Sequence, residues 1–188
     1  MIGNNLLFRF CLLFSGLIII NGCGQPKPDI GRFINRVIVF PKTLFSMTIG
    51  EAKQSVDTAA TVKIVTYIGS ERCDDCSLRI LSNWKQLMAD LDTVALSVEF
   101  VFVFAPRQVE TLYSGLQVHR FTYPVLCDSL RSFEWANPDL PVESVFRTFL
   151  LDSANRVVLV GSPIGNRKLW ELYKQQIGKL TGQNGAAE

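Results

Sequence analysis

The sequence predicts an α/β domain with a central mixed sheet and helices on both faces. From residue 62 onward, segments rich in β-branched and aromatic residues alternate with amphipathic segments, and two apolar segments near the C-terminus flank a run of turn-forming residues. Alternating strands and helices indicate parallel strands, and a hairpin adds antiparallel strands at one edge. With 188 residues, 48% of them hydrophobic, the chain can bury one core.

The first half of this pattern surrounds a pair of cysteines. Val62–Ile68 is rich in β-branched residues and ends at Gly69-Ser70, which predicts a strand. Apolar residues then recur at helical spacing, which predicts a helix from about Cys76 to Leu91. The nearly all-apolar run Val98–Phe104 predicts a strand that is covered on both faces.

The second half continues the alternation. An apolar stripe from Val109 to Leu116 predicts a helix, and Tyr123–Asp128 contains a short strand. Phe146–Leu151 and Arg156–Val160 flank four turn-forming residues, which predicts a hairpin. The stripe from Leu169 to Leu180 predicts the last helix.

The region before residue 62 is less regular. Arg36–Pro41 predicts a short strand that proline ends, whereas residues 46–60 are polar and small and support no assignment. Aromatic residues of the periodic segments, such as Trp84 and Phe100, are interpreted as core. The same interpretation is preferred for Phe133–Trp135, with the lining of a substrate groove as the alternative.

The first 23 residues form a separate unit. Arg9 precedes an apolar run from Phe10 to Ile20, shorter than the roughly 20 residues that span a bilayer. The small residues before Cys23 resemble the lipobox of bacterial lipoproteins, in which cleavage leaves the cysteine as a lipidated N-terminus. This resemblance implies that residues 1–22 are a lipoprotein signal peptide. The alternative is an ordinary membrane anchor or an uncleaved leader.

The predicted organisation follows from this leader. Residues 23–30, with two prolines and polar residues, form a tether; residues 31–181 form the single domain; residues 182–188 form a flexible tail. The lipid anchor predicts a location in the bacterial cell envelope, with the domain facing the periplasm. A net charge of +2 without any Lys/Arg run argues against a nucleic-acid partner.

The stretch ERCDDCS contains the candidate reactive residues. Once the leader is removed and Cys23 is lipidated, the remaining thiols are Cys73, Cys76 and Cys127. Disulfides form and persist outside the cytoplasm, so an accessible pair there is redox-active unless it binds metal. Cys73 would lie exposed at a helix start, where the helix dipole favours its thiolate and makes it the attacking group. Cys76, one turn further along, would resolve the mixed disulfide.

The charged neighbours tune this pair. Arg72 favours the Cys73 thiolate, whereas Asp74 and Asp75 oppose it, each by up to roughly 3 kcal/mol at about 5 Å and an effective dielectric near 20. Two acids against one base predict a less acidic thiol than in strong oxidases, and therefore a reductant or neutral exchanger. Alternatively, both aspartates only cap and solvate the helix start.

The order strand–Cys-x-x-Cys–helix resembles the thioredoxin-like superfamily, and in particular its lipid- or membrane-anchored members related to the TlpA and thiol-peroxidase groups. The resemblance rests on TYIGSERCDDC, on the Tyr123–Asp128 stretch and on TFLLDSANRVVLVG. It implies a thioredoxin-like fold and thiol–disulfide exchange with extracytoplasmic proteins. The implied partners are a protein disulfide substrate and an upstream electron donor, and no cofactor is implied.

Two features depart from the superfamily pattern. Its enzymes place a cis-proline before the hairpin strand, facing the cysteines, where it helps to dock the substrate backbone. Alignment on Thr148–Asp152 puts Phe146 at that position, so a cis bond after Val145 is not expected and the substrate groove is altered. The superfamily also carries a buried acid on the central strand. The corresponding position is near Tyr67, and none of residues 64–70 is acidic.

Three other functions compete with this interpretation. Zinc could use only Cys73, Cys76, Cys127 and His119. Cys127, however, lies in an apolar strand and is interpreted as core, and His119 is interpreted as a surface or structural residue at a helix end. A peroxidase would need proline and threonine before its cysteine, and residues 67–73 contain neither. The third is a redox-inactive thioredoxin-like lipoprotein that acts as a binding module, with the pair as a structural disulfide.

Overall fold

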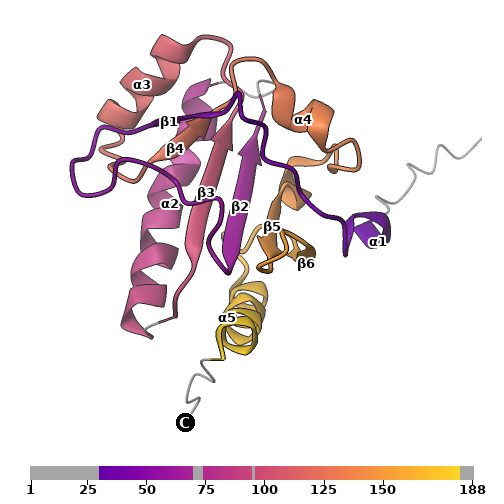
Figure 1. Ribbon diagram of the computed structural model, residues 1–188. Coiled ribbons are helices and arrows are strands. Elements are labelled where there is room, and N and C mark those ends of the chain that lie inside the picture. Colours follow the sequence, from indigo (N-terminus) through magenta and orange to yellow (C-terminus); the bar gives the residue numbers. More distant parts are fainter. Residues whose placement is uncertain (1–29, 70–73, 95, 183–188) are drawn as a thin grey trace, which may run out of the picture.

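The computed structural model describes residues 30–69, 74–94 and 96–182 (Figure 1). Its strands are β1 (Phe45–Met47), β2 (Lys63–Ile68), β3 (Glu99–Phe104), β4 (Val125–Cys127), β5 (Thr148–Leu151) and β6 (Val157–Val160). Its helices are α1 (Ile30–Phe33), α2 (Asp74–Thr93), α3 (Val109–Val118), α4 (Ser132–Ala136), the 3-10 turn η1 (Ser144–Phe146) and α5 (Arg167–Thr181). No helix within these residues combines the length and apolarity needed to cross a bilayer.

The strands form one mixed sheet in the order β1-β4-β3-β2-β5-β6. The three central strands β4, β3 and β2 are parallel, and the β5–β6 hairpin adds two antiparallel strands at one edge. The predicted α/β class and the predicted hairpin edge are therefore confirmed. β1, which pairs antiparallel with β4 at the other edge, was not predicted.

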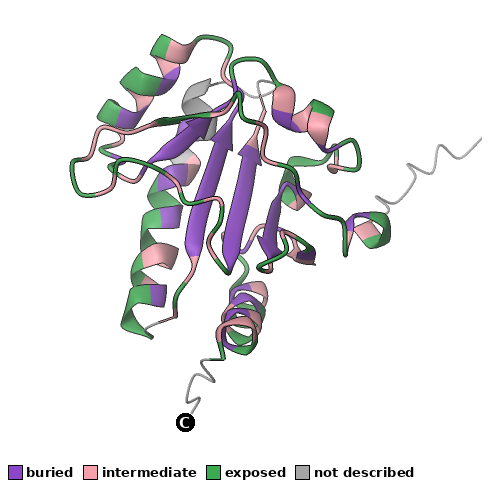
Figure 2. Ribbon diagram, viewed as in Figure 1, coloured by how far each residue is buried: buried purple, intermediate pink, exposed green. Residues whose placement is uncertain are grey.

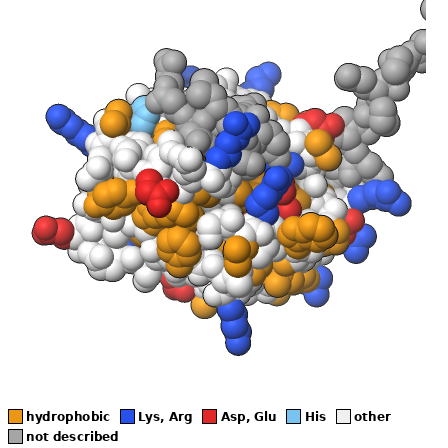
Figure 3. All heavy atoms as spheres, turned by 90° about the horizontal axis from the view of Figure 1, so that it is seen from above, with side chains coloured by type: hydrophobic (Ala, Val, Ile, Leu, Met, Phe, Trp, Pro, Cys, Tyr) orange, Lys and Arg blue, Asp and Glu red, His pale blue; other side chains and the backbone are white. Residues whose placement is uncertain are grey.

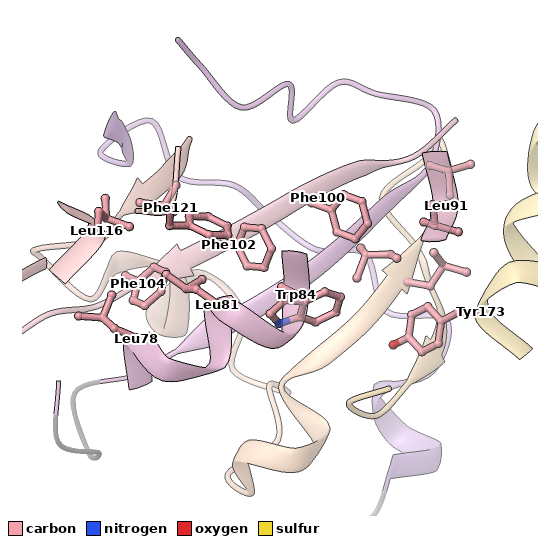
Figure 4. Close-up of a cluster of buried hydrophobic side chains, with 14 of the residues drawn as sticks. Leu78, Leu81, Trp84, Leu91, Phe100, Phe102, Phe104, Leu116, Phe121 and Tyr173 are labelled. Atoms are coloured by element: carbon pink, nitrogen blue, oxygen red, sulfur yellow. The ribbon is translucent and has the colours of Figure 1, made fainter. Parts of the chain in front are cut away.

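One face of the sheet carries the long helices. Figure 2 shows the central strands almost entirely buried. On this face α2, α3 and α5 share one core cluster with the sheet, and Figure 4 shows its aromatic centre. Trp84 of α2 packs edge-on against Phe100 and Phe102 of β3, with ring centroids 5.9 and 5.6 Å apart. The helical stripe predicted after the cysteines thus faces the sheet.

The opposite face is covered by short elements. Phe33 of α1 packs edge-on against Phe149 of β5 at 5.1 Å, and Phe133 of α4 stacks on Tyr67 of β2 at 5.4 Å. These residues belong to a second buried cluster. Helices therefore lie on both faces, but only short helices and loops cover this one.

Two predicted strands are corrected. The segment 36–41 is no strand: only Val37 forms a bridge, to Arg156. Two backbone hydrogen bonds flank this bridge: the Asn35 N–H donates to the Val157 carbonyl, and the Val157 N–H donates to the Arg36 carbonyl. Phe146 lies in η1, and β5 begins two residues later. Both segments are rich in residues that favour strands, but fewer of their residues pair with a neighbouring strand than the sequence predicted.

Of the unassigned residues 46–60, those that follow β1 form a strap that is attached to β3 and to the segment before β4. Lys53 Nζ lies 2.5 Å from Glu99 Oε2 and donates to the Tyr123 hydroxyl at 2.9 Å. The Asp57 N–H donates to the other oxygen of the same buried carboxylate at 2.9 Å. The polar residues of this segment thus hold it against β3 and Tyr123.

Gly50 of this strap lies against the backbone of Thr122. A Cβ there would lie 2.3 Å from the Thr122 carbonyl oxygen and 2.9 Å from the Thr122 Cβ. Because a backbone atom cannot yield as a side chain can, Gly50→Ala is expected to lower the free energy of unfolding by about 1–3 kcal/mol. Urea denaturation measures this. Glu51→Ala, at the exposed neighbouring position, should change stability by no more than about 0.5 kcal/mol, and equal effects of the two variants would contradict the steric explanation.

Candidate functional site

The cysteine motif spans the start of the longest described helix. β2 ends at Ile68, and the 20-residue helix α2 begins at Asp74, directly after Cys73. Cys76 is the third residue of α2, so it lies in the first turn. Arg72 and Cys73 lie outside the described residues, as do the side chains of Asp74, Asp75 and Cys76; Cys23 lies outside them too.

The predicted groove residues lie at the same end of the sheet. β5 pairs antiparallel with β2, and the Tyr67 N–H donates to the Arg147 carbonyl at 2.9 Å. Val145 and Phe146 immediately precede this contact, in η1. Val145 is 51% exposed and Phe146 is partly buried, so this turn presents apolar surface. All peptide bonds among the described residues are trans.

Tyr67 occupies the β2 position where the superfamily resemblance implies an acid. Its ring is buried between Phe133, which stacks on it, and the Arg147 guanidinium, 5.3 Å from the ring centroid. Burial raises the pKa of its hydroxyl well above the usual range, with smaller contributions from Glu134 and Asp128. This hydroxyl has no hydrogen-bond partner among the residues that the structure describes. Tyr67 is therefore neutral at physiological pH and supplies no carboxylate-like base.

An ion-pair network that the sequence did not predict fixes the loop before β5. The buried Arg147 guanidinium lies 3.3 Å from Glu134 of α4 and donates through Nε to the Pro141 carbonyl at 2.7 Å. Glu134 also pairs with Arg131 at 2.8 Å. Since Glu134 lies in α4 and Arg147 lies just before β5, only the fold brings these two residues together beside the end of β2.

Helix α4 itself is anchored by a buried carboxylate. Asp128, at the end of β4, accepts hydrogen bonds from the Ser132 N–H and hydroxyl and from the Phe133 N–H, at 2.8–2.9 Å. These bonds satisfy donors of the first turn, as a capping residue does. Asp128, the last residue of the Tyr123–Asp128 stretch, thus fixes the start of α4 relative to the sheet.

The core interpretation of residues 133–135 holds for Phe133 and is wrong for Trp135. Phe133 is fully buried, whereas Trp135 is 85% exposed. On a short helix, successive positions face different sides, and only the Phe133 side meets the sheet. Figure 3, which looks onto this end of the molecule, shows further apolar side chains on the surface; Leu130, Val142 and Val145 are among the exposed ones.

The remaining candidate ligands are structural. Cys127 is fully buried in β4, and burial, with a smaller effect of Asp128, raises the pKa of its thiol to about 11. It is therefore an unreactive thiol, as predicted from its apolar strand. His119 follows the last residue of α3 as its C-cap. Within the described part of the chain, no three His, Cys, Asp or Glu side chains cluster as metal ligands.

The hollow next to the start of α2 is small. Its volume is about 10 Å³, and its walls include Ile68, Leu78, Phe104 and Leu112. Small-molecule sites usually measure about 300–1,000 Å³. The described residues at this hollow therefore enclose no chamber of that size.

Comparison with known proteins identifies the fold. No family model and no curated protein matches the sequence. Among solved structures, the chain is similar to the thioredoxin domain of a thiol-disulfide oxidoreductase from Bacteroides vulgatus, with 11% identity, a TM-score of 0.51, and 77% of this chain and 97% of that chain covered. It is also similar to a SCO1/SenC family lipoprotein from Bacillus anthracis, with 17% identity, a TM-score of 0.54, and 78% and 96% covered. The chain therefore has the thioredoxin-like fold that its motifs predicted.

Proposed function

We propose that the chain is a membrane-anchored thiol–disulfide oxidoreductase that reduces disulfides of extracytoplasmic proteins. The observation that carries this proposal is the position of Cys73-Asp-Asp-Cys76 across the start of α2, where β2 ends, in a thioredoxin-like fold. The partly exposed apolar turn at Val145–Phe146, at the same end of the sheet, supports a protein substrate that binds on the surface.

The proposed reaction has two balanced steps. The Cys73 thiolate attacks one sulfur of the substrate disulfide; a Cys73–substrate disulfide forms, and the other substrate sulfur leaves as a thiolate that takes up a proton. The Cys76 thiolate then attacks the Cys73 sulfur and releases the second substrate thiol. The substrate gains two electrons and the pair becomes a disulfide, which an upstream dithiol donor must reduce again.

The local charges favour a mild reductant. The N-terminus of the long helix α2 carries a partial positive charge of about half an elementary charge, which stabilises a thiolate at its first turn. Arg72 adds to this effect, whereas Asp74 and Asp75 oppose it. A thiolate that is only modestly stabilised makes the reduced form less favourable than in strong oxidases.

Redox titration tests the proposal against its alternative, a redox-inactive binding module. That alternative is favoured by Phe146, which stands where the superfamily has its substrate-docking proline. We expect the Cys73–Cys76 pair to titrate at a potential above about −300 mV and to reduce a disulfide-bonded reporter protein when a dithiol is supplied. A potential below that value, together with no reporter reduction, would favour the binding module.

Attachment to the membrane is proposed to occur through lipid on Cys23. The short apolar run before Gly22-Cys23 motivates this assignment. In cells fed a labelled fatty acid, the wild-type chain is expected to take up label and Cys23→Ser to take up none, because the acceptor thiol is lost. Cys11→Ser, which removes the other leader cysteine, is the matched control and should keep its label. Label that persists in Cys23→Ser would contradict the anchor.

A further inference from the structure

The buried side chain of Arg147 joins three segments of the chain. Its Nε donates to the Pro141 carbonyl at 2.7 Å, and its Nη1 lies 3.3 Å from Glu134 Oε1 of α4. The guanidinium also lies over the ring of Tyr67, near the end of β2. Only 9% of the Arg147 side chain is exposed, so these contacts are shielded from water.

The turn before Arg147 depends on tertiary contacts for its position. Between α4 and β5, a stretch that the structure describes throughout, the only regular element is the three-residue turn η1. A 3-10 turn of this length is not stable by itself. The Val145 carbonyl accepts a hydrogen bond from the Ser162 N–H, and the Arg147 carbonyl accepts one from the Tyr67 N–H, both at 2.9 Å. The Arg147 side chain adds the attachment to α4 and to Pro141.

Packing does not require a charge at position 147. An apolar side chain of similar size could cover the Tyr67 ring without the cost of removing a guanidinium from water. What arginine supplies is a planar group with several N–H donors in fixed directions, which can bond acceptors on two segments at once. The acceptors here are Glu134 and the Pro141 carbonyl. The charge therefore sets the position of the turn relative to α4.

This position matters because the turn lies at the end of the sheet that carries the cysteine motif. Tyr67 meets Arg147 one residue before β2 ends at Ile68. In Figure 1, β2 points toward the end of the sheet at which α2 begins. We infer that Arg147 is a positioning residue, which holds Val145–Phe146 in the place where a protein substrate docks. This inference rests on the proposed function, in which Val145–Phe146 is the docking turn.

Loss of the Arg147 contacts should weaken docking and leave the sulfur chemistry unchanged. If the turn occupies the docking position in a smaller fraction of molecules, the apparent affinity for the substrate falls by the same factor. Arg147→Met keeps an apolar stem but loses the hydrogen bonds of the charged group. It should therefore raise the KM for insulin, a disulfide-bonded reporter protein, about tenfold. The kcat should change by no more than about twofold.

Two substrates of different size test this inference. Reduction of insulin by the full chain in detergent, with dithiothreitol as the electron donor, gives kcat and KM. The second substrate is 4,4′-dithiodipyridine, a small uncharged disulfide that needs no docking turn, mixed with chain that has been reduced and freed of dithiothreitol. The part of its reduction rate that requires Cys73 should change by no more than about twofold in Arg147→Met.

A conservative variant and a matched control accompany Arg147→Met. Arg147→Lys keeps the charge but not the planar fork, so its KM for insulin should rise only about threefold. It replaces Arg147→Met if circular dichroism shows that the methionine variant does not fold. Lys174→Met also removes a cation that links two elements, since Lys174 of α5 lies 3.2 Å from Asp90, near the other end of α2. This control should leave kcat and KM within about twofold of the wild type.

The results separate the possible failures. An unchanged KM in Arg147→Met, or an equal rise in Lys174→Met, would overturn the inference. It would also be overturned if the rates with insulin and with the small disulfide fell by the same factor at an unchanged KM, because Arg147 would then only stabilise the fold. In all these cases a wild type that reduces insulin leaves the proposed redox function standing. If the wild type reduces neither substrate, the proposed function itself fails, and this inference fails with it.

Discussion

Replacing Cys76 with serine is expected to trap a mixed disulfide between Cys73 and its partner protein. Cys73 can still attack the substrate disulfide, but the thiol that would release the substrate is gone, so turnover should fall by about 100-fold or more. After acid quenching, membranes that carry the variant should show a band on non-reducing gels that dithiothreitol removes. Its mass and peptides identify the partner.

The other two thiols of the domain provide the controls. Cys73→Ser should trap nothing, because the attacking sulfur is missing. Cys127→Ser should leave exchange intact, since Cys127 is buried in β4 and burial raises its pKa to about 11. If Cys76→Ser captures no partner and the pair is as hard to reduce as a structural disulfide, the oxidoreductase proposal fails.

Replacing Trp84 with alanine is expected to lower the free energy of unfolding by about 3–5 kcal/mol. Trp84 is fully buried at the centre of the larger core cluster, where α2 meets β3 (Figure 4). Its ring contacts Phe100 and Phe102 edge-on, and these contacts and the buried area would be lost together. Urea denaturation should show a lower midpoint with a similar slope.

Trp84→Phe is the matched variant. The indole N–H of Trp84 is buried and has no hydrogen-bond partner among the described residues, so phenylalanine gives up no hydrogen bond. We expect it to cost about 1.5 kcal/mol or less, because it keeps a ring at the α2–β3 contact. If the urea midpoint of Trp84→Ala equals that of the wild type within error, the Trp84 ring does not contribute to core stability as expected.

The main secondary structure could be predicted because its signals are local. Lys63–Ile68 and Glu99–Phe104 consist mostly of apolar residues because both of their faces are covered. The apolar stripe of α2 repeats at helical spacing because one side of the helix meets the sheet. The hairpin follows from four turn-forming residues between two apolar runs. The sequence therefore predicted the cysteine motif between the end of a strand and the start of a helix. In the structure, β2 ends at Ile68 and α2 begins at Asp74, so the motif has this position in the chain.

Tertiary structure decided what depends on partners distant in the sequence. β1 is short and largely exposed, and only its pairing with β4 makes it a strand. Nothing local distinguishes buried Phe133 from exposed Trp135, because the contact with Tyr67 selects which side of α4 faces the sheet. Likewise, Arg147 is buried because Glu134 and the Pro141 carbonyl compensate its charge. The spacing of apolar residues in the sequence indicates which side chains can be buried. Only the folded chain determines which residues each buried side chain contacts.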